Sequence, residues 1–195
     1  HQGIGFDFSS RIEIASLDYE GISLKDFDYD GSYETNYISS VNDKVDLLSG
    51  FKGIAYYDIT ETDRVFTSVS AGYKAGGVNQ NPFIADVNKY YDPEQNINFE
   101  LGYKSFKEES SYQATLFYML RENLQVNVSA QQEPGNPNSF YYFTSNASGG
   151  HNYGMELERS QVFLDNKIKL TSSIGYLETW IDRYEFYTDE STVMT

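Results

Sequence analysis

The most regular pattern in the chain runs through residues 112–128, where apolar and polar positions alternate. Even positions such as Leu116 and Leu120 are apolar or aromatic, and odd positions such as Gln113 and Asn123 are polar. A period of two predicts a β-strand with one dry face and one wet face. At roughly 3.3 Å per residue the strand would exceed about 50 Å, whereas about 9 to 11 residues suffice to cross a bilayer. This strand is therefore long enough to cross a membrane and to extend beyond it.

Six further segments carry strand patterns of the same kind. In one of them Ile97, Phe99 and Leu101 alternate with Asn98 and Glu100. The sequence therefore predicts about seven strands in total. They lie at residues 8–19, 46–58, 64–74, 97–104, 112–128, 140–161 and 167–182.

Short turns and long polar loops alternate between these strands. The short turns are TETD at 60–63, KEES at 107–110 and the turn around Asp165 and Asn166. The long connections are an acidic loop at 21–44, a polar loop at 75–92, and a loop at 131–139 that is rich in Pro, Gly and Asn. Short turns on one side and long loops on the other are typical of outer-membrane barrels.

Composition is compatible with a membrane barrel without establishing one. Of the 195 residues 39% are hydrophobic, and the mean hydropathy of −0.54 is typical of a soluble protein. Transmembrane barrels share this composition, because only alternate residues face lipid. No run of about 18 apolar residues is present, which excludes a spanning helix. The 18 Tyr and 13 Phe suit membrane interfaces, although aromatic residues also favour strands in general.

Charge and cysteine content argue against two other classes. A net charge of −15 is unfavourable for a nucleic-acid partner, because binding requires Lys and Arg to neutralise phosphates. The absence of Cys is unfavourable for a small secreted domain held by disulfides. Residues 1–10 show no signal peptide.

Four motifs, in this order and spacing, resemble the barrel domain of TonB-dependent outer-membrane receptors. In that family one strand climbs to a loop of the form G-[FY]-K-x-G-G-[FV]-N, and the next descends through PE…N-[FY]-E-[LV]-G-[YVF]-K. A strand with A-x-[FL]-[FY] and a terminal LQV follows, and then a strand with G-x-E-[LI]-E. Each motif is weak alone, but four in register are specific. The matching residues are Gly72, Tyr73, Lys74, Gly76, Gly77, Val78 and Asn79; Pro93, Glu94, Asn98, Phe99, Glu100, Leu101, Gly102, Tyr103 and Lys104; Ala114, Phe117, Tyr118, Leu124, Gln125 and Val126; and Gly154, Glu156, Leu157 and Glu158.

The resemblance implies an all-β fold, an antiparallel meander of about seven long strands within a transmembrane β-barrel of about 22 strands. It implies a place in the bacterial outer membrane, among lipid and lipopolysaccharide. A complete receptor of this kind binds a scarce nutrient, such as a ferric siderophore, haem, cobalamin or a glycan. Energy supplied through TonB then displaces the receptor's own plug domain and the nutrient passes inward. Binding and gating of this kind need no catalytic residue.

The chain also departs from the family pattern. Within residues 1–195 we expect no plug domain and no energy-coupling box before the barrel strands. The chain stops at Val193, Met194 and Thr195, whereas the family's terminal strand has an aromatic last residue. We therefore expect residues 1–195 to form a partial barrel domain, roughly a third of the whole.

Several motif residues have expected physical roles. Gly76 and Gly77 would allow a positive φ where a strand leaves the barrel wall. Glu100, Glu156 and Glu158 lie on polar faces of their strands. Facing the lumen, they could pair with Lys or Arg of a plug domain, but solvation or pairing with a neighbouring strand is the preferred interpretation.

Ligand contacts in this chain are expected in the loops that open outward. Aromatic and amide side chains there suit sugars and catecholates alike, and they are also ordinary loop residues. The candidates are Asn79, Asn81, Tyr90 and Tyr91 in one loop, and Gln131, Asn136, Asn138 and Tyr141 in another.

A calcium site has weak support. Asp26, Asp28 and Asp30 supply the D-x-D-x-D-G opening of a calcium loop. The twelfth position, however, is Tyr37, where such a loop needs a bidentate Glu. A solvated acidic loop is the preferred interpretation, and no cofactor or metal is expected.

A hydrolytic site has even less support. The chain has two histidines, His1 and His151, so a Ser-His-Asp arrangement would depend on His151. A lumenal or loop position for His151 is the preferred interpretation.

Two other functions share parts of the pattern. A passive barrel such as a porin would show the same alternation and the same turns. A soluble, carbohydrate-binding β-sandwich would have strands nearer 5 to 6 residues and would need a second sheet to cover the apolar face of 112–128.

Overall fold

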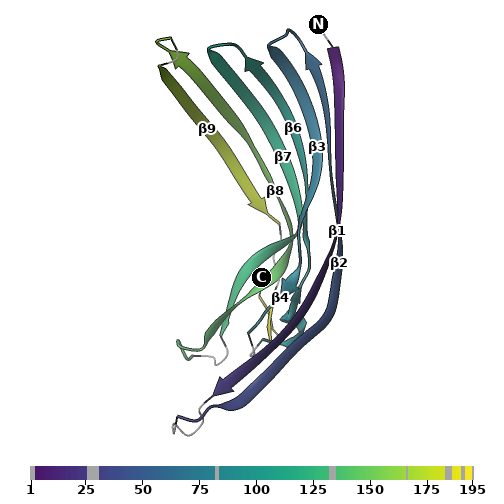
Figure 1. Ribbon diagram of the computed structural model, residues 1–195. Coiled ribbons are helices and arrows are strands. Elements are labelled where there is room, and N and C mark those ends of the chain that lie inside the picture. Colours follow the sequence, from purple (N-terminus) through teal and green to yellow (C-terminus); the bar gives the residue numbers. More distant parts are fainter. Residues whose placement is uncertain are drawn as a thin grey trace.

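The structure is a computed structural model, which describes residues 3–25, 31–81, 84–131, 135–165, 167–182, 186–189 and 192–194. Its main feature is one antiparallel sheet of seven strands, in the order β1-β2-β3-β6-β7-β8-β9 (Figure 1). Each long strand pairs with the next long strand along the chain, so the sheet is a meander. The strands are β1 (Gly3–Lys25), β2 (Glu34–Asp58), β3 (Asp63–Lys74), β6 (Glu94–Phe106), β7 (Ser110–Gln131), β8 (Phe140–Phe163) and β9 (Ile168–Ile181).

The predicted meander of about seven strands is confirmed. The predicted acidic loop at 21–44 is wrong for most of its length, because Gly21 pairs with Ser39 and Leu24 with Thr35. Strand pairing satisfies backbone N–H and C=O groups whether or not the side chains are apolar. The polarity of this segment indicated contact with water but did not indicate a loop. The chain there continues as a two-stranded ribbon of β1 and β2.

Smaller elements fill the connection between β3 and β6. Strand β4 (Gly77–Val78) pairs with β5 (Tyr90–Tyr91), and a short 3₁₀-helix, η1 (Asp86–Asn88), lies between them. Near the C-terminal end, β10 (Phe186–Asp189) pairs with β11 (Thr192–Met194). No helix in the described part of the chain is long and apolar enough to cross a membrane.

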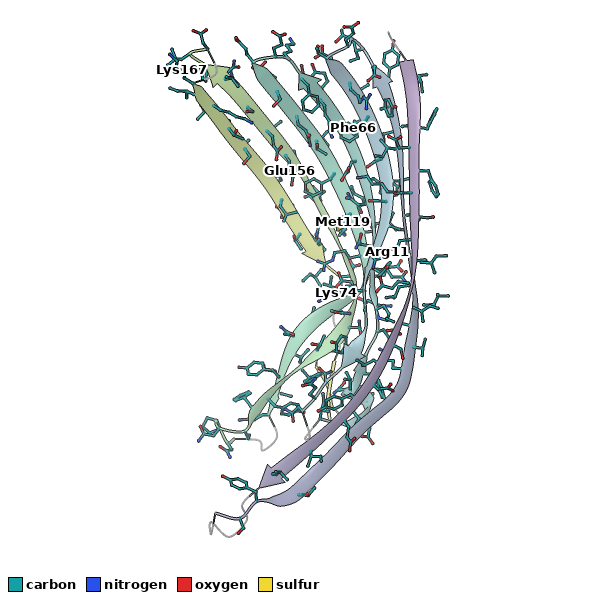
Figure 2. All side chains as sticks on the ribbon, viewed as in Figure 1. Arg11, Phe66, Lys74, Met119, Glu156 and Lys167 are labelled. Carbon is teal, nitrogen blue, oxygen red and sulfur yellow. The ribbon has the colours of Figure 1, made fainter. Side chains whose placement is uncertain are left out.

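All the short turns lie at one end of the sheet, the upper end in Figure 1, and the long connections lie at the other. We call these the short-turn end and the loop end. In Figure 2, Lys167 marks the short-turn end, and Lys74, the last residue of β3, lies toward the loop end. The predicted alternation of turns and loops is confirmed.

The turn between β2 and β3 is organised around one carboxylate. Asp63 accepts hydrogen bonds from the hydroxyls of Thr60 at 2.6 Å, Thr62 at 2.9 Å and Tyr103 at 2.5 Å. Bonds from Thr60, then Tyr103, Ser105 and Thr62, hold the pKa of the Asp63 carboxyl well below its usual range. This TETD turn therefore keeps a charged, fully bonded carboxylate at the short-turn end.

One face of the sheet is apolar. Paired residues lie on the same face, so the register defines rows that run across the strands. Four such rows span β3 to β9. Moving from the short-turn end toward the loop end, they are Val65, Tyr103, Ala114, Leu157 and Ile174; Thr67, Leu101, Leu116, Met155 and Tyr176; Val69, Phe99, Tyr118, Tyr153 and Glu178; and Ala71, Ile97, Leu120, His151 and Trp180.

The apolar rows have the height of a bilayer. Along β7 the exposed apolar face runs from Tyr112 to Leu120, and the side chain of Leu116 at its middle is 56% exposed. This length matches the roughly 9 to 11 residues that a transmembrane strand needs. A continuous exposed apolar surface on a folded chain marks a place of contact with a membrane or with another protein.

Beyond this band β7 changes its surroundings. Asn123 has a φ of 52°, in the left-handed region, and interrupts the strand's regular geometry. After it, Leu124 is only 4% exposed, and Val128 and Ala130 are also buried. Val128 and Ala130 pack with Ile84 of the chain's own β3–β6 connection. The single dry face predicted for 112–128 is therefore divided into an uncovered half and a half that belongs to a small core.

Candidate functional site

The loop end contains the buried apolar cluster of the described chain. Ile84 of the β3–β6 connection packs with Val128 and Ala130 of β7 and Phe143 of β8. Tyr141 lies against this cluster, and its ring stacks on that of Phe143 with centroids 5.9 Å apart. The cluster joins the β3–β6 connection to the β7–β8 hairpin. These are the two loops in which ligand contacts were predicted.

Asn79 fastens the same two loops by hydrogen bonds. Its Nδ2 donates to the carbonyl oxygens of Asn88 at 2.8 Å and Thr144 at 2.7 Å, and its Oδ1 accepts from the Thr144 N–H at 2.7 Å. The side-chain amide thus bonds to Thr144 of β8 as a neighbouring strand would. With 9% of its surface exposed, Asn79 has its polar atoms engaged within the protein.

Asn146 of β8 also connects the β3–β6 connection to the β7–β8 hairpin by hydrogen bonds. Its Oδ1 accepts from the Asp92 N–H at 2.7 Å, and its Nδ2 donates to the carbonyl oxygens of Asp92 at 3.0 Å and Asn123 at 2.8 Å. Gln125 adds bonds from its Nε2 to the carbonyl oxygens of Ala75 at 2.8 Å and Asp92 at 3.1 Å. Three amide side chains, those of Asn79, Asn146 and Gln125, therefore hold the β3–β6 connection against the β7–β8 hairpin.

Next to these amides a partly buried ion pair joins β6 to β7. Glu94 is 6% exposed, and its Oε1 accepts from Nε of Arg121 at 2.8 Å and from Nη2 at 2.5 Å. Its Oε2 accepts from the Gln125 N–H at 3.0 Å. Both carboxylate oxygens are thus used at the point where β7 departs from regular geometry.

The motif glycines at this end act by close approach. A Cβ on Gly76 would lie 2.5 Å from the carbonyl oxygen of Tyr91, and one on Gly77 would lie 2.2 Å from the Tyr91 hydroxyl. Among the described glycines, the positive φ values belong to Gly31 and Gly135. The predicted positive φ at Gly76 and Gly77 is therefore wrong. The Tyr91 backbone leaves no room for a side chain at Gly76, and a side chain at Gly77 would require the Tyr91 ring to move.

Lys44 of β2 completes the attachment of this connection. Its Nζ donates to the carbonyl oxygen of Tyr91 at 2.6 Å and lies 3.8 Å from a carboxylate oxygen of Asp46. A Cβ on Gly76 would also come within 2.7 Å of this Nζ. The β3–β6 connection is therefore held from both sides, by β2 and by β8.

The predicted ligand contacts have unequal access to solvent. Tyr90 is 47% exposed, and Asn138 is exposed as well. Asn81, Tyr91, Gln131, Asn136 and Tyr141 are half-buried. Gln131 donates from Nε2 to the carbonyl oxygen of Asn136 at 2.8 Å, which shapes its own loop. The structure therefore brings the two predicted loops together and leaves a minority of the predicted side chains exposed.

Sequence reasoning did not single out two exposed aromatics at this end. Phe140 and Tyr142, at the start of β8, are 54% and 73% exposed. Their side chains alternate with those of Tyr141 and Phe143, which pack into the cluster. The alternation along the strand predicts that Phe140 and Tyr142 lie on one face and Tyr141 and Phe143 on the other. It could therefore have identified one pair as exposed, because only one face of this hairpin is covered.

The second face of the sheet is largely polar. Glu100 accepts hydrogen bonds from Ser68 at 2.8 Å and from Asn98 Nδ2 at 2.9 Å. Asn98 Oδ1 and Thr115 Oγ1 are buried on this face and have no hydrogen-bond partner among the described residues. A cavity of about 300 Å³ opens on it. The charged residues that line the cavity are Asp7, Lys52, Arg64, Glu100, Lys104 and Glu156.

The motif glycines of the barrel wall also mark close approaches. A Cβ on Gly102 would lie 2.3 Å from the ring of Phe66, and one on Gly154 would lie 2.0 Å from the carbonyl oxygen of Tyr176 and 2.7 Å from the Phe117 ring. The other motif residues of the wall lie along β3, β6, β7 and β8, with Glu100 and Glu156 on the polar face.

The remaining candidates for site chemistry do not assemble into a site. Among the described residues, no three His, Cys, Asp or Glu side chains lie close enough to hold a metal ion. Asp26, Asp28 and Asp30 lie outside the described residues, as does His1. His151 lies between the rings of Tyr118 and Trp180, at 5.9 and 6.3 Å, on the apolar face. A loop position for His151 is wrong, because it lies within β8, where its register places it among aromatic residues.

Comparison with known proteins agrees with this arrangement. Residues 14–193 match the β-barrel of the TonB dependent receptor-like family. The chain belongs to this receptor family. The receptor chain is 35% identical to the pesticin receptor of Yersinia pestis over 72 residues, which are 37% of this chain and 11% of that protein. It is 33% identical to the pesticin receptor of Yersinia enterocolitica over the same length.

A solved structure shows the same fold. The receptor chain aligns with the ferric yersiniabactin uptake receptor FyuA of Yersinia pestis with a TM-score of 0.58 and 24% sequence identity. The alignment covers 91% of this chain and 24% of that one. The matched region is thus a small share of each relative. The seven-stranded sheet corresponds to a section of barrel wall and does not close on itself among the described strands.

Proposed function

We propose that this chain is part of the wall and the outer loops of an outer-membrane receptor that imports a small-molecule nutrient with energy supplied through TonB. One observation carries the proposal: the sheet has an exposed apolar face of transmembrane height and an opposite polar face. A soluble sandwich would cover the apolar face, and the described chain leaves it open. Membership of the receptor family supports the same conclusion.

The orientation follows from the two ends of the sheet. Outer-membrane barrels have short periplasmic turns and longer extracellular loops. The short-turn end is therefore assigned to the periplasm and the loop end to the outside. Tyr90 and Asn138 of the predicted contacts, and with them Phe140 and Tyr142, are then exposed where an incoming ligand arrives.

A ferric siderophore is the first nutrient to test. FyuA takes up ferric yersiniabactin, and aromatic and amide side chains suit the aromatic and oxygen-rich surfaces of such chelates. Haem, cobalamin and glycans present similar surfaces and are the alternatives. Asn79 is assigned a positioning role, because its amide atoms bond to Asn88 and Thr144.

The polar face is assigned to the lumen, where a plug domain would lie. The mixed charges of the cavity, Lys52 and Lys104 with Glu100 and Glu156 among them, give polar groups of both signs to a plug. Asn98 Oδ1 and Thr115 Oγ1 supply buried polar atoms that a plug side chain could reach.

Uptake of radiolabelled ferric siderophore by cells that depend on the full-length gene product tests the proposal. Uptake should be saturable and should disappear when TonB is removed. Replacement Tyr90→Ala should weaken binding by about tenfold, the scale of one lost aromatic contact. Tyr57→Ala, at the short-turn end, is the matched control and should leave binding unchanged. Uptake that persists without TonB would instead identify a passive barrel.

A further inference from the structure

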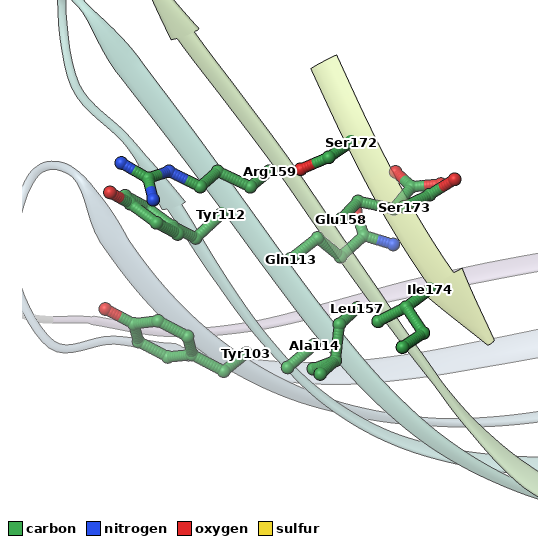
Figure 3. Close-up of a pocket in the computed structure, with 10 residues that line it drawn as sticks. All are labelled: Tyr103, Tyr112, Gln113, Ala114, Leu157, Glu158, Arg159, Ser172, Ser173 and Ile174. Carbon is green, nitrogen blue, oxygen red and sulfur yellow. The ribbon is translucent and has the colours of Figure 1, made fainter. Parts of the chain in front are cut away.

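A groove on the apolar face lies near the short-turn end, across β6 to β9 (Figure 3). Its volume is about 320 Å³. Gln113, Glu158 and Ser173 also border it, but their register places their side chains on the polar face. The lining side chains of the apolar face are Tyr103, Tyr112, Ala114, Leu157, Arg159, Ser172 and Ile174.

The floor of the groove is made by one small residue. Tyr103, Ala114, Leu157 and Ile174 are consecutive members of one row across the strands. The Ala114 side chain is a single methyl group between the larger Tyr103 and Leu157. Ala114 therefore leaves a depression with apolar sides between Tyr103 and Leu157, and we call this depression the channel.

One end of the groove carries an isolated cation. Arg159 pairs in register with Tyr112 and Ser172, one row nearer the short-turn end. Among Lys and Arg residues on the seven strands whose side chains are described, Arg159 alone falls on the apolar face. The others that pair in these strands, such as Lys52, Lys104 and Arg121, fall on the polar face.

Arg159 has weak polar contacts within the protein. Its guanidinium lies 5.2 Å from the centroid of the Tyr112 ring, and Nη2 is 3.4 Å from Gln161 Oε1. Figure 3 shows the guanidinium beside the Tyr112 ring, at one end of the groove. Among the described residues it forms no ion pair, although five other pairs are present. A lipid-facing Arg is costly unless its charge reaches the interface or meets an anion.

We propose that this groove binds one phospholipid of the periplasmic leaflet, with the phosphodiester at Arg159 and an acyl chain along Ala114. Arg pairs with phosphate through two parallel N–H···O bonds, and the Tyr112 hydroxyl lies at the same end of the groove. The chain as a whole carries a net charge of −15, so it does not attract anions in general. A phosphate at this position would therefore bind because of Arg159 itself. The inference rests on the proposed function, because it requires the apolar face to lie in a membrane.

Native mass spectrometry of the full-length gene product tests the site. The purified receptor would be equilibrated with phosphatidylglycerol, or with diacylglycerol of the same acyl chains, in detergent. Wild type should retain one phosphatidylglycerol in preference to diacylglycerol. Arg159→Gln should reduce that retention by about tenfold, the scale of one charge-assisted hydrogen bond. Lys169→Gln, which removes a cation from the polar face of β9, should retain the lipid as wild type does.

A second variant tests the acyl part of the site. Ala114→Leu keeps the face apolar but fills the channel, and it should displace both lipids while the charge at Arg159 is intact. Equal retention by wild type, Arg159→Gln and Ala114→Leu would overturn the proposal. Siderophore uptake, measured in parallel, separates the two claims. Normal uptake by a wild-type protein that retains no lipid would refute the lipid site alone. Absence of the wild-type protein from the membrane fraction would refute the proposed function.

Discussion

At the scale of single residues, amide side chains connect the loops by hydrogen bonds to main-chain groups, as backbone pairing connects the strands elsewhere in this fold. Asn79 and Asn146 each bond to main-chain groups of a segment distant in sequence. The motif identified Asn79 as special, but its partner Thr144 lies 65 residues away. Sequence spacing gives no information about such a contact, so the residue was predicted and its structural role was not.

The ion pair between Glu94 and Arg121 gives a prediction at this scale. Arg121→Met removes the cation and leaves the Glu94 carboxylate buried, which should lower the free energy of unfolding by about 3 kcal/mol. The double variant Glu94→Gln with Arg121→Met should recover much of that loss, because no unpaired charge remains. Urea unfolding of the full gene product in liposomes measures both values. Equal losses in the single and the double variant would show that the pair is not coupled.

At the scale of elements, the sequence predicted the strands well and their surroundings less well. The period of two located all seven strands, because a sheet with one apolar and one polar face imposes it directly. It could not show that β7 is covered by the β3–β6 connection beyond Asn123. An apolar face looks the same in sequence whether lipid or protein covers it.

Two glycines on neighbouring strands give a matched prediction for the packing of β8 against β9. A Cβ on Gly154 would lie 2.0 Å from the Tyr176 carbonyl oxygen, whereas one on Gly175 would lie 3.9 Å from its nearest neighbour, the Met155 carbonyl oxygen. Gly154→Ala should therefore destabilise the barrel by about 1–3 kcal/mol, the usual cost of overpacking. Gly175→Ala should have little effect. Heat-modifiable migration on gels gives the unfolding temperature of each variant, and equal temperatures would contradict the assignment.

At the scale of the whole molecule, the two faces of the sheet are the basis of the proposed orientation of the chain in a bilayer. The motifs predicted the family, and the match over residues 14–193 confirms it. The nutrient could not be predicted in the same way. The proposed contacts to it lie in loops, and loop sequences vary independently of the barrel wall.

Charge placed on either face tests this orientation. Leu116→Arg puts a cation at the middle of the apolar band and should reduce stability in liposomes by about 2–4 kcal/mol. Gln113→Arg places the same side chain on the polar face of the same strand and should have a much smaller effect. Urea titration of both variants in lipid vesicles gives the comparison. Similar losses would mean that the faces have been assigned wrongly.

The nearest-neighbour pairing of the meander also bears on how such walls change over evolutionary time. Every long strand pairs with the long strands that precede and follow it along the chain, so no pairing bridges a distant hairpin. Duplication or deletion of one hairpin would require one new strand pairing, at the place where the flanking strands then meet. Every other strand pairing would keep its register. The circumference of a wall built in this way can therefore grow or shrink in steps of two strands, while the loops at its mouth diversify separately.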